Sequence, residues 1–219
     1  MSSDTQPGSI REARNSILAE IGDAVTLVAA SKRQPDDRID DALAAGQRVF
    51  GENRVQEAQE RWGDRLAQFE DLELRLIGPL QTNKAEDAVK LFHVIETLDR
   101  EKLLKALTKG VEKTGASAPD LFIQVNTGDE PQKGGVSVAG LSELITTTRD
   151  LYPGRLLGLM CIPPADEPAA PHFALLKKLA DAHDLPQVSM GMSGDYALAA
   201  RLGATHVRVG TAFFGARET

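Results

Sequence analysis

The chain has 219 residues, with 25 Lys and Arg against 32 Asp and Glu, so its formal net charge at pH 7 is −7. The length suits one sizeable core and is close to the lower limit of an eight-unit α/β barrel, so we expect a single domain over residues 1–219. The acidic balance disfavours nucleic acid or an anionic membrane as the main partner, and an anionic ligand would need a local site.

The N-terminus and the cysteine content predict a cytoplasmic protein. Residues 1–8 are polar, and no apolar stretch approaches the roughly 20 residues of a membrane span. Cys161 is the only cysteine, which excludes an internal disulfide and fits a reducing compartment. We therefore expect neither secretion nor membrane insertion.

Short apolar runs alternate with helical patterns along the chain. Apolar residues at helical spacing over residues 10–21 stop at Gly22, which predicts an opening amphipathic helix. Asp36 and Asp37 offer an N-cap for the next helix, and residues 83–91 give the weakest helical pattern. The predicted strands cover residues 25–31, 48–50, 73–77, 92–96, 121–126, 155–160, 187–190 and 206–209.

Eight strands that alternate with helices favour a parallel sheet, and eight such units in this length favour closure. The predicted fold is a single (β/α)8 TIM-type barrel with an extra N-terminal helix. An open doubly wound sheet is the alternative. No Gly-x-Gly-x-x-Gly follows the first strand, so a dinucleotide fold has no specific support.

Lys32 follows the first predicted strand and is the candidate reactive group. Partial burial at the mouth of a barrel favours the neutral, nucleophilic form of a lysine amine. Such an amine can form a Schiff base with an aldehyde. The alternative is that Lys32 ends the strand and points into water.

The last two strands are followed by Ser193-Gly194-Asp195 and by Gly210-Thr211, which resemble a phosphate cradle. Hydroxyls and N–H groups at helix starts bind phosphate, and these two loops are the usual phosphate position in such barrels. Plain capping by Ser193 and Thr211 is the alternative. Other strand exits carry Glu52, Asn53, Gly78, Gln81, Asn83, Asn126 and Met160.

Arg208 lies two residues before Gly210, so both share one face of the last strand. An inward arginine would be a costly buried cation unless a ligand atom or a carboxylate satisfied it. A salt bridge within the barrel, for example to Glu52, is the structural alternative.

Three other features carry less weight. The four histidines lack a metal-binding spacing, so no metal site is expected. Cys161 fits a small buried hydrophobe better than a nucleophile. The loop at Lys133 could lend a cation to an anion, although a solvated turn is favoured.

Seven blocks along the chain form an ordered pattern. They are Ala30-Ser31-Lys32, 50–57, 77–84, Gln124-Val125-Asn126, Gly158-Leu159-Met160, 189–195 and 207–215. In these blocks the chain resembles the pyridoxal 5′-phosphate homeostasis proteins, which share the barrel of the alanine racemase N-terminal domain. The chain departs at Leu74-Arg75-Leu76, just before Ile77-Gly78, where family members commonly carry an aromatic residue and a histidine, so no role of that histidine is carried over to this chain.

The resemblance implies that pyridoxal 5′-phosphate (PLP) is bound as an internal aldimine on Lys32, with its phosphate held at the last two loops. It also implies that Arg208 faces the pyridine nitrogen and that Asn53 lies near the ring. An arginine there would keep the nitrogen unprotonated and weaken the electron sink that carbanion chemistry needs. The expected cofactor-binding residues are Lys32, Asn53, Met160, Ser193, Arg208, Gly210 and Thr211, and no catalytic residue is expected.

The expected function is a non-catalytic, monomeric PLP-binding protein that buffers the cofactor or passes it to apoenzymes in transient contact. The alternative is a slow amino-acid racemase that uses Lys32 as its base. Racemases on this barrel use a second domain and a partner subunit, for which a chain ending at Thr219 leaves no room. A Schiff-base aldolase acting on sugar phosphates is a third possibility that the resemblance disfavours.

Overall fold

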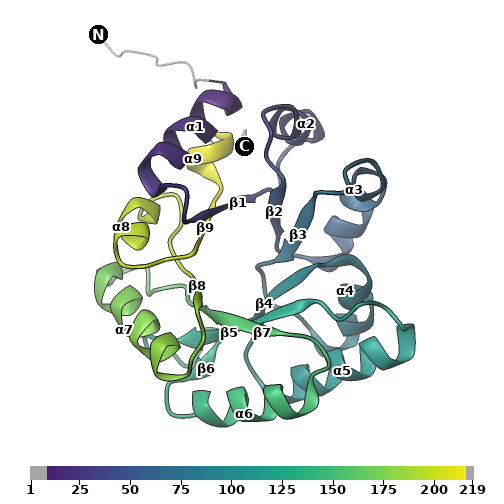
Figure 1. Cartoon of the computed structure of the whole chain (residues 1–219), viewed down its shortest axis with the longest axis vertical. Helices are drawn as coiled ribbons and strands as arrows, with labels where there is room; N and C mark the ends of the chain where they lie inside the picture. The colour runs from purple at the N-terminus through teal and green to yellow at the C-terminus, as the bar shows by residue number, and fades with distance from the viewer. Residues whose placement is uncertain (1–8, 216–219) are drawn as a thin grey trace.

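The computed structural model describes residues 9–215, which form a closed barrel of eight parallel strands surrounded by helices (Figure 1). Around the barrel the order is β4-β3-β2-β1-β9-β8-β7-β5, and the pairing of β5 with β4 closes the ring. The strands are β1 Thr26–Ala30, β2 Val49–Glu52, β3 Glu73–Leu76, β4 Val94–Leu98, β5 Asp120–Asn126, β6 Val136–Ser137, β7 Leu156–Met160, β8 Gln187–Ser189 and β9 His206–Val209.

Helices follow the strands and cover the outside of the barrel (Figure 1). They are α1 Ile10–Ile21, α2 Asp36–Ala44, α3 Val55–Gln68, the 3-10 helix η1 Thr82–Lys84, α4 Ala85–Leu91, α5 Glu101–Thr114, α6 Leu141–Leu151, α7 Ala169–Ala182, α8 Tyr196–Arg201 and α9 Thr211–Phe214. The predicted TIM-type barrel with an extra N-terminal helix is confirmed. In the described part of the chain, no helix combines the length and apolar character needed to cross a bilayer.

Capping residues define both ends of the extra helix α1. Ser9 and Glu12 form a reciprocal capping box at its start, and Gly22 ends it with φ of 75°. Ile17 and Ile21 are buried, and α1 packs against α9, α8 and α2. The helix therefore covers the outside of the barrel next to the last strand (Figure 1).

Two local predictions were wrong. Neither Asp36 nor Asp37 caps α2, because Pro35 is the N-cap residue and both carboxylates lie in the first turn, where they favour the positive end of the helix. The ninth strand, β6, was not predicted; it pairs only with β5, outside the ring of eight.

The strands separate a large outer core from a small, mixed interior. Apolar side chains between strands and helices form the main hydrophobic cluster. Inside the barrel Val94, Phe122 and Met160 form a second cluster, beside charged side chains that include Arg75 and Arg208. The interior is therefore a place where charges must be satisfied by neighbouring protein groups.

Candidate functional site

The seven predicted cofactor-binding residues come from five strands that are neighbours in the barrel. Since the strands are parallel and ordered β2-β1-β9-β8-β7, their carboxyl ends meet along one arc of the same rim. From β2 to β7, the arc carries Asn53, Lys32, Arg208 with Gly210 and Thr211, Ser193 and Met160.

Lys32 and Asn53 line one cavity of about 240 Å³ at this rim, together with Arg33, Arg54 and Glu57. Lys32 is half-buried, two residues beyond the end of β1. Lys32 and Asn53 thus lie together at one cavity, as the strand order predicts.

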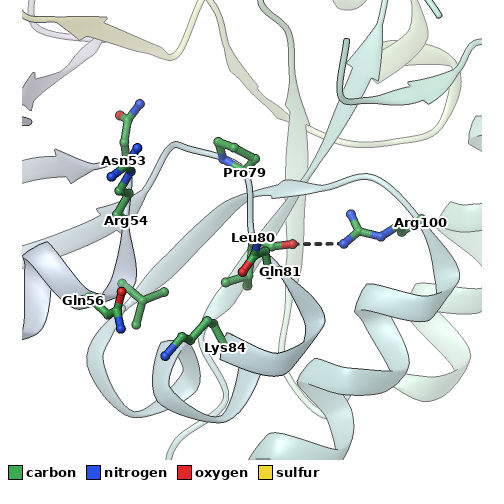
Figure 2. Close-up of a pocket in the computed structure, with 9 residues that line it drawn as sticks. Asn53, Arg54, Gln56, Pro79, Leu80, Gln81, Lys84 and Arg100 are labelled. Atoms are coloured by element: carbon green, nitrogen blue, oxygen red, sulfur yellow. Dashed lines mark hydrogen bonds between the residues drawn. The ribbon is translucent and has the colours of Figure 1, made fainter. Parts of the chain in front are cut away.

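A second, larger cavity of about 690 Å³ adjoins the first, because Asn53 and Arg54 line both. Figure 2 shows Lys84 and Arg100 on its other side, with a hydrogen bond of 3.0 Å from Arg100 Nη2 to the carbonyl oxygen of Leu80. The chain is acidic overall, yet this cavity is lined by three cationic side chains and no carboxylate.

Ser193 lies against the start of α9. Its Oγ accepts hydrogen bonds of 3.2 Å from the backbone N–H of Gly210 and of Ala212. Two N–H donors that converge on one oxygen can hold a phosphate oxygen equally well. Ser193 does not cap its own helix, since Asp195 is the N-cap of α8, and Thr211 is the exposed first residue of α9.

Arg208 points into the barrel and is almost completely buried. Its Nη1 donates to Ser189 Oγ at 2.7 Å and its Nη2 donates to the carbonyl oxygen of Cys161 at 2.8 Å. Ser189 in turn donates to Glu96 Oε2 at 2.6 Å, and Glu96 lies 3.9 Å from the Arg208 guanidinium. The suggested salt bridge to Glu52 was therefore wrong, since Glu96 is the carboxylate that faces Arg208.

Arg75 binds the same carboxylate from the other side. Its Nη1 donates to Glu96 Oε1 at 2.9 Å, and its Nη2 lies 2.9 Å from Nε2 of His206. Because a guanidinium only donates, His206 Nε2 must accept, so Nδ1 carries the proton and can donate to Thr205 Oγ1 at 2.8 Å. Arg75, within the Leu74-Arg75-Leu76 departure, is thus part of a buried ionic cluster.

Burial and charge set the protonation states of this cluster. Burial, reinforced by the Arg75 cation, lowers the pKa of His206 to about 4, so the imidazole is neutral at pH 7. Burial acts to raise the pKa of Glu96, but the cations Arg75 and Arg208 outweigh it, and the pKa is lowered. Glu96 is therefore a carboxylate between two guanidinium groups.

The structure also shows the surroundings of Cys161 and Lys133 and tests for a metal site. Cys161 is fully buried, and burial raises the pKa of its thiol to about 12, which favours a small hydrophobe over a nucleophile. Lys133 forms an ion pair of 2.7 Å with Glu130 in its loop. Within residues 9–215 no three metal-ligating side chains gather into a possible metal site.

Sequence reasoning missed Glu96, Ser189 and the contribution of Arg75 to the interior. The sequence offered one signal, period-2 alternation, which places Glu96 and Val94 on the same face of β4. The structure shows that this face is the inner one, where Glu96 lies between two arginines.

The alanine racemase N-terminal domain family matches residues 26–218 of the chain. The pyridoxal phosphate homeostasis protein of Aquifex aeolicus (strain VF5) is 40% identical over 201 residues, with 88% of this chain and 87% of that protein covered. The protein of the same name from Escherichia coli (strain K12) is 37% identical over 209 residues, with coverages of 89% and 86%.

Among solved structures, PipY of Synechococcus elongatus PCC7942 with PLP bound is 37% identical with a TM-score of 0.85, and the match covers 94% of this chain and 100% of that one. Alanine racemase from Corynebacterium glutamicum is 17% identical with a TM-score of 0.71, with 97% of this chain and 62% of that chain covered, which shows a common fold alone. The chain therefore belongs to the alanine racemase N-terminal domain family and, within it, to the pyridoxal phosphate homeostasis proteins.

Proposed function

We propose that this protein binds PLP covalently through Lys32 and takes part in intracellular PLP homeostasis. One observation carries the proposal: neighbouring strands bring a half-buried lysine, two convergent N–H donors and a buried arginine to one rim of the barrel. The PLP-bound PipY structure, with the same fold at 37% identity, supports it.

The arrangement of donors fits the chemistry of the cofactor. When bound, PLP supplies an aldehyde that condenses with a primary amine and a pyridine ring that can act as an electron sink. In the proposed site Lys32 provides the amine, and Ser193, Gly210 and Thr211 hold the phosphate dianion. Asn53 lines the rim cavity beside Lys32, and the proposed contact of Met160 with the ring is made from the end of β7.

The non-catalytic role is proposed because Arg208 faces the ring nitrogen of the cofactor in the proposed site. A guanidinium remains protonated in proteins, so it can donate to a ring nitrogen and cannot protonate it. Its bond to Ser189 and its proximity to Glu96 support this fixed, charged state. An unprotonated ring nitrogen weakens the electron sink, so this chain's residues favour storage of the cofactor over carbanion chemistry.

We further propose that the protein acts in the cytoplasm as a monomer and passes PLP to apoenzymes during transient contact. The exposure of the proposed phosphate site supports this role, because Thr211 and the adjoining Ala212 lie at the surface. Release would then need hydrolysis of the covalent link by water and loss of the contacts to the ring and the phosphate.

A titration with PLP tests the binding site. The wild type and Lys84→Ala, which removes an amine from the adjoining cavity, are expected to gain the visible absorption band of lysine-bound PLP. Lys32→Ala is expected to gain none. An equal band in Lys32→Ala would overturn the assignment.

A second assay tests the absence of turnover. The PLP-loaded protein is expected to leave the α-protons of free amino acids unexchanged in deuterated solvent. Exchange that disappears in Lys32→Ala would instead establish a racemase-type activity with Lys32 as the base.

A further inference from the structure

The turn that carries Lys32 is held from outside the barrel by Arg61 of α3. Arg61 Nη1 donates to the carbonyl oxygen of Ser31 at 3.0 Å, and its Nη2 donates to the carbonyl oxygen of Gln34 at 2.9 Å. These two carbonyls lie on either side of Lys32 in the sequence, so a single guanidinium is hydrogen-bonded to both ends of the turn.

Glu52 holds Arg61 in place. The carboxylate is fully buried, and its Oε1 accepts from Arg61 Nη1 at 3.0 Å, from Ser31 Oγ at 2.8 Å and from Trp62 Nε1 at 3.0 Å. A buried carboxylate is costly without a cation and hydrogen-bond donors, so this geometry strongly favours the Arg61 conformation. Glu52 also contacts the turn directly, through the Ser31 hydroxyl.

The turn itself needs support. Arg33 has φ of 57°, in the left-handed region, which is unfavourable for a non-glycine residue. The N–H of Gln34 closes the turn on the carbonyl oxygen of Ser31 at 3.1 Å, the same oxygen that Arg61 binds. The clamp formed by Arg61 and Glu52 therefore stabilises a backbone conformation that is unfavourable by itself.

We propose that Arg61, oriented by Glu52, is a positioning residue that fixes the Lys32 turn so that the amine reaches an aldehyde at the rim. The proposal rests on the function proposed above. In that reaction the Lys32 nitrogen bonds to the aldehyde carbon, and the aldehyde oxygen leaves as water with the two amine protons. Without the clamp the Lys32 amine is still present, but it is no longer held close to the aldehyde. Holding two reacting groups in position contributes strongly to the rate of their reaction.

Arg65 provides a matched control on the same helix. The side chains of Arg61 and Arg65 are 18% and 16% exposed, and both approach Asp36. Arg65 then binds Asp40 of α2 at 2.8 Å, whereas Arg61 binds the backbone of the Lys32 turn. Arg65→Gln therefore removes a similarly buried cation, together with its ion pairs to exposed aspartates, without releasing the turn.

Two measurements test the clamp. In cofactor-free protein, Arg61→Gln is expected to speed hydrogen exchange of the amides of residues 31–34 by about tenfold or more, and Arg65→Gln is expected to change it by less than about twofold. On addition of PLP, the visible band is expected to form about tenfold more slowly in Arg61→Gln only. Arg61→Lys, which keeps the charge but not the fork of donors, is expected to fall between the two and replaces Arg61→Gln if that variant does not fold.

The outcomes separate the clamp from the proposed function. Unchanged exchange in Arg61→Gln, or equal slowing of the band in Arg65→Gln at a similar loss of Tm, would overturn the clamp. A wild type that never attaches PLP would contradict the proposed function, and faster exchange confined to the Arg61 variants would still support the clamp on the turn.

Discussion

Glu96 is the residue on which the charges of the barrel interior depend. It accepts from Arg75 at one oxygen and from Ser189 at the other, and Arg208 lies 3.9 Å away. Two guanidinium groups thus share one buried carboxylate. Removal of that carboxylate leaves Arg208 without a facing carboxylate and leaves Arg75 paired with Glu73 alone, which is strongly destabilising for two buried cations.

Glu96→Gln is expected to lower the free energy of unfolding by about 3 kcal/mol or more, because Arg75 and Arg208 lose their shared anion. Urea unfolding at pH 7 measures the change. Glu101→Gln is the control, since it removes the exposed ion pair with Lys105 and should cost less than about 1 kcal/mol. Similar small losses in both variants would contradict a central role for Glu96.

The identity of the carboxylate that faces Arg208 could not be predicted from the sequence. Residues of β2 and β4 are buried almost throughout, so neither strand shows the contrast of apolar and polar faces that reveals orientation. Glu52 was therefore the suggested partner, and Glu96 was missed. The structure separates them, because Glu52 bonds to the α3 side chains Arg61 and Trp62 on the outside.

At the scale of elements, the site depends on the close approach of two loops at the rim. Gly78, after β3, lies so near the residue after β2 that a Cβ at position 78 would be 2.3 Å from the carbonyl oxygen of Asn53. Only glycine allows this approach. The loop after β3 thus sets the position of Asn53, which lines both rim cavities.

Gly78→Ala is expected to displace Asn53 and to weaken PLP binding by about tenfold or more, since roughly 1.4 kcal/mol of misfit suffices. The binding titration that follows the visible band gives the affinity. Gly63→Ala in α3 serves as the control, because nothing lies within 4 Å of its added Cβ, and it should bind PLP normally and gain about 0.5–1 kcal/mol in stability. Normal PLP affinity in Gly78→Ala would refute this dependence.

The sequence predicted the elements well where it carried a recognisable apolar run. All eight barrel strands follow from such runs, and even the weak pattern over residues 83–91 corresponds to the end of η1 and to α4. The β6 strand has only two residues, too few for any alternation. The strand exits located Lys32, Asn53 and Ser193 because parallel strands of a barrel end at one rim.

At the scale of the whole molecule, the buried charges predict sensitivity to acid. The pKa of His206 is about 4 in the folded protein, below its ordinary value of 6.5, so the unfolded chain takes up this proton first as the pH falls. His206 therefore costs no stability above pH 6.5, and stability is lost as the pH falls from there toward 4. The lowered pKa of Glu96 adds a loss at still lower pH.

Cofactor-free wild type is expected to lose on the order of 3 kcal/mol between pH 6.5 and 4 through His206. His206→Gln, which retains an acceptor for Arg75, should remove up to about 1.4 kcal/mol per pH unit from that slope near pH 5. Urea unfolding at a series of pH values gives both curves. Parallel curves would show that His206 does not control the acid sensitivity.

The covalent attachment of PLP to Lys32 is tested most directly by reduction and peptide mapping. The PLP-loaded protein is treated with borohydride, digested and analysed by mass spectrometry, so that the reduced cofactor marks the lysine that held it. We predict the added mass on the peptide that contains Lys32. A label on another lysine, such as Lys84 or Lys133, or no label at all, would contradict the account.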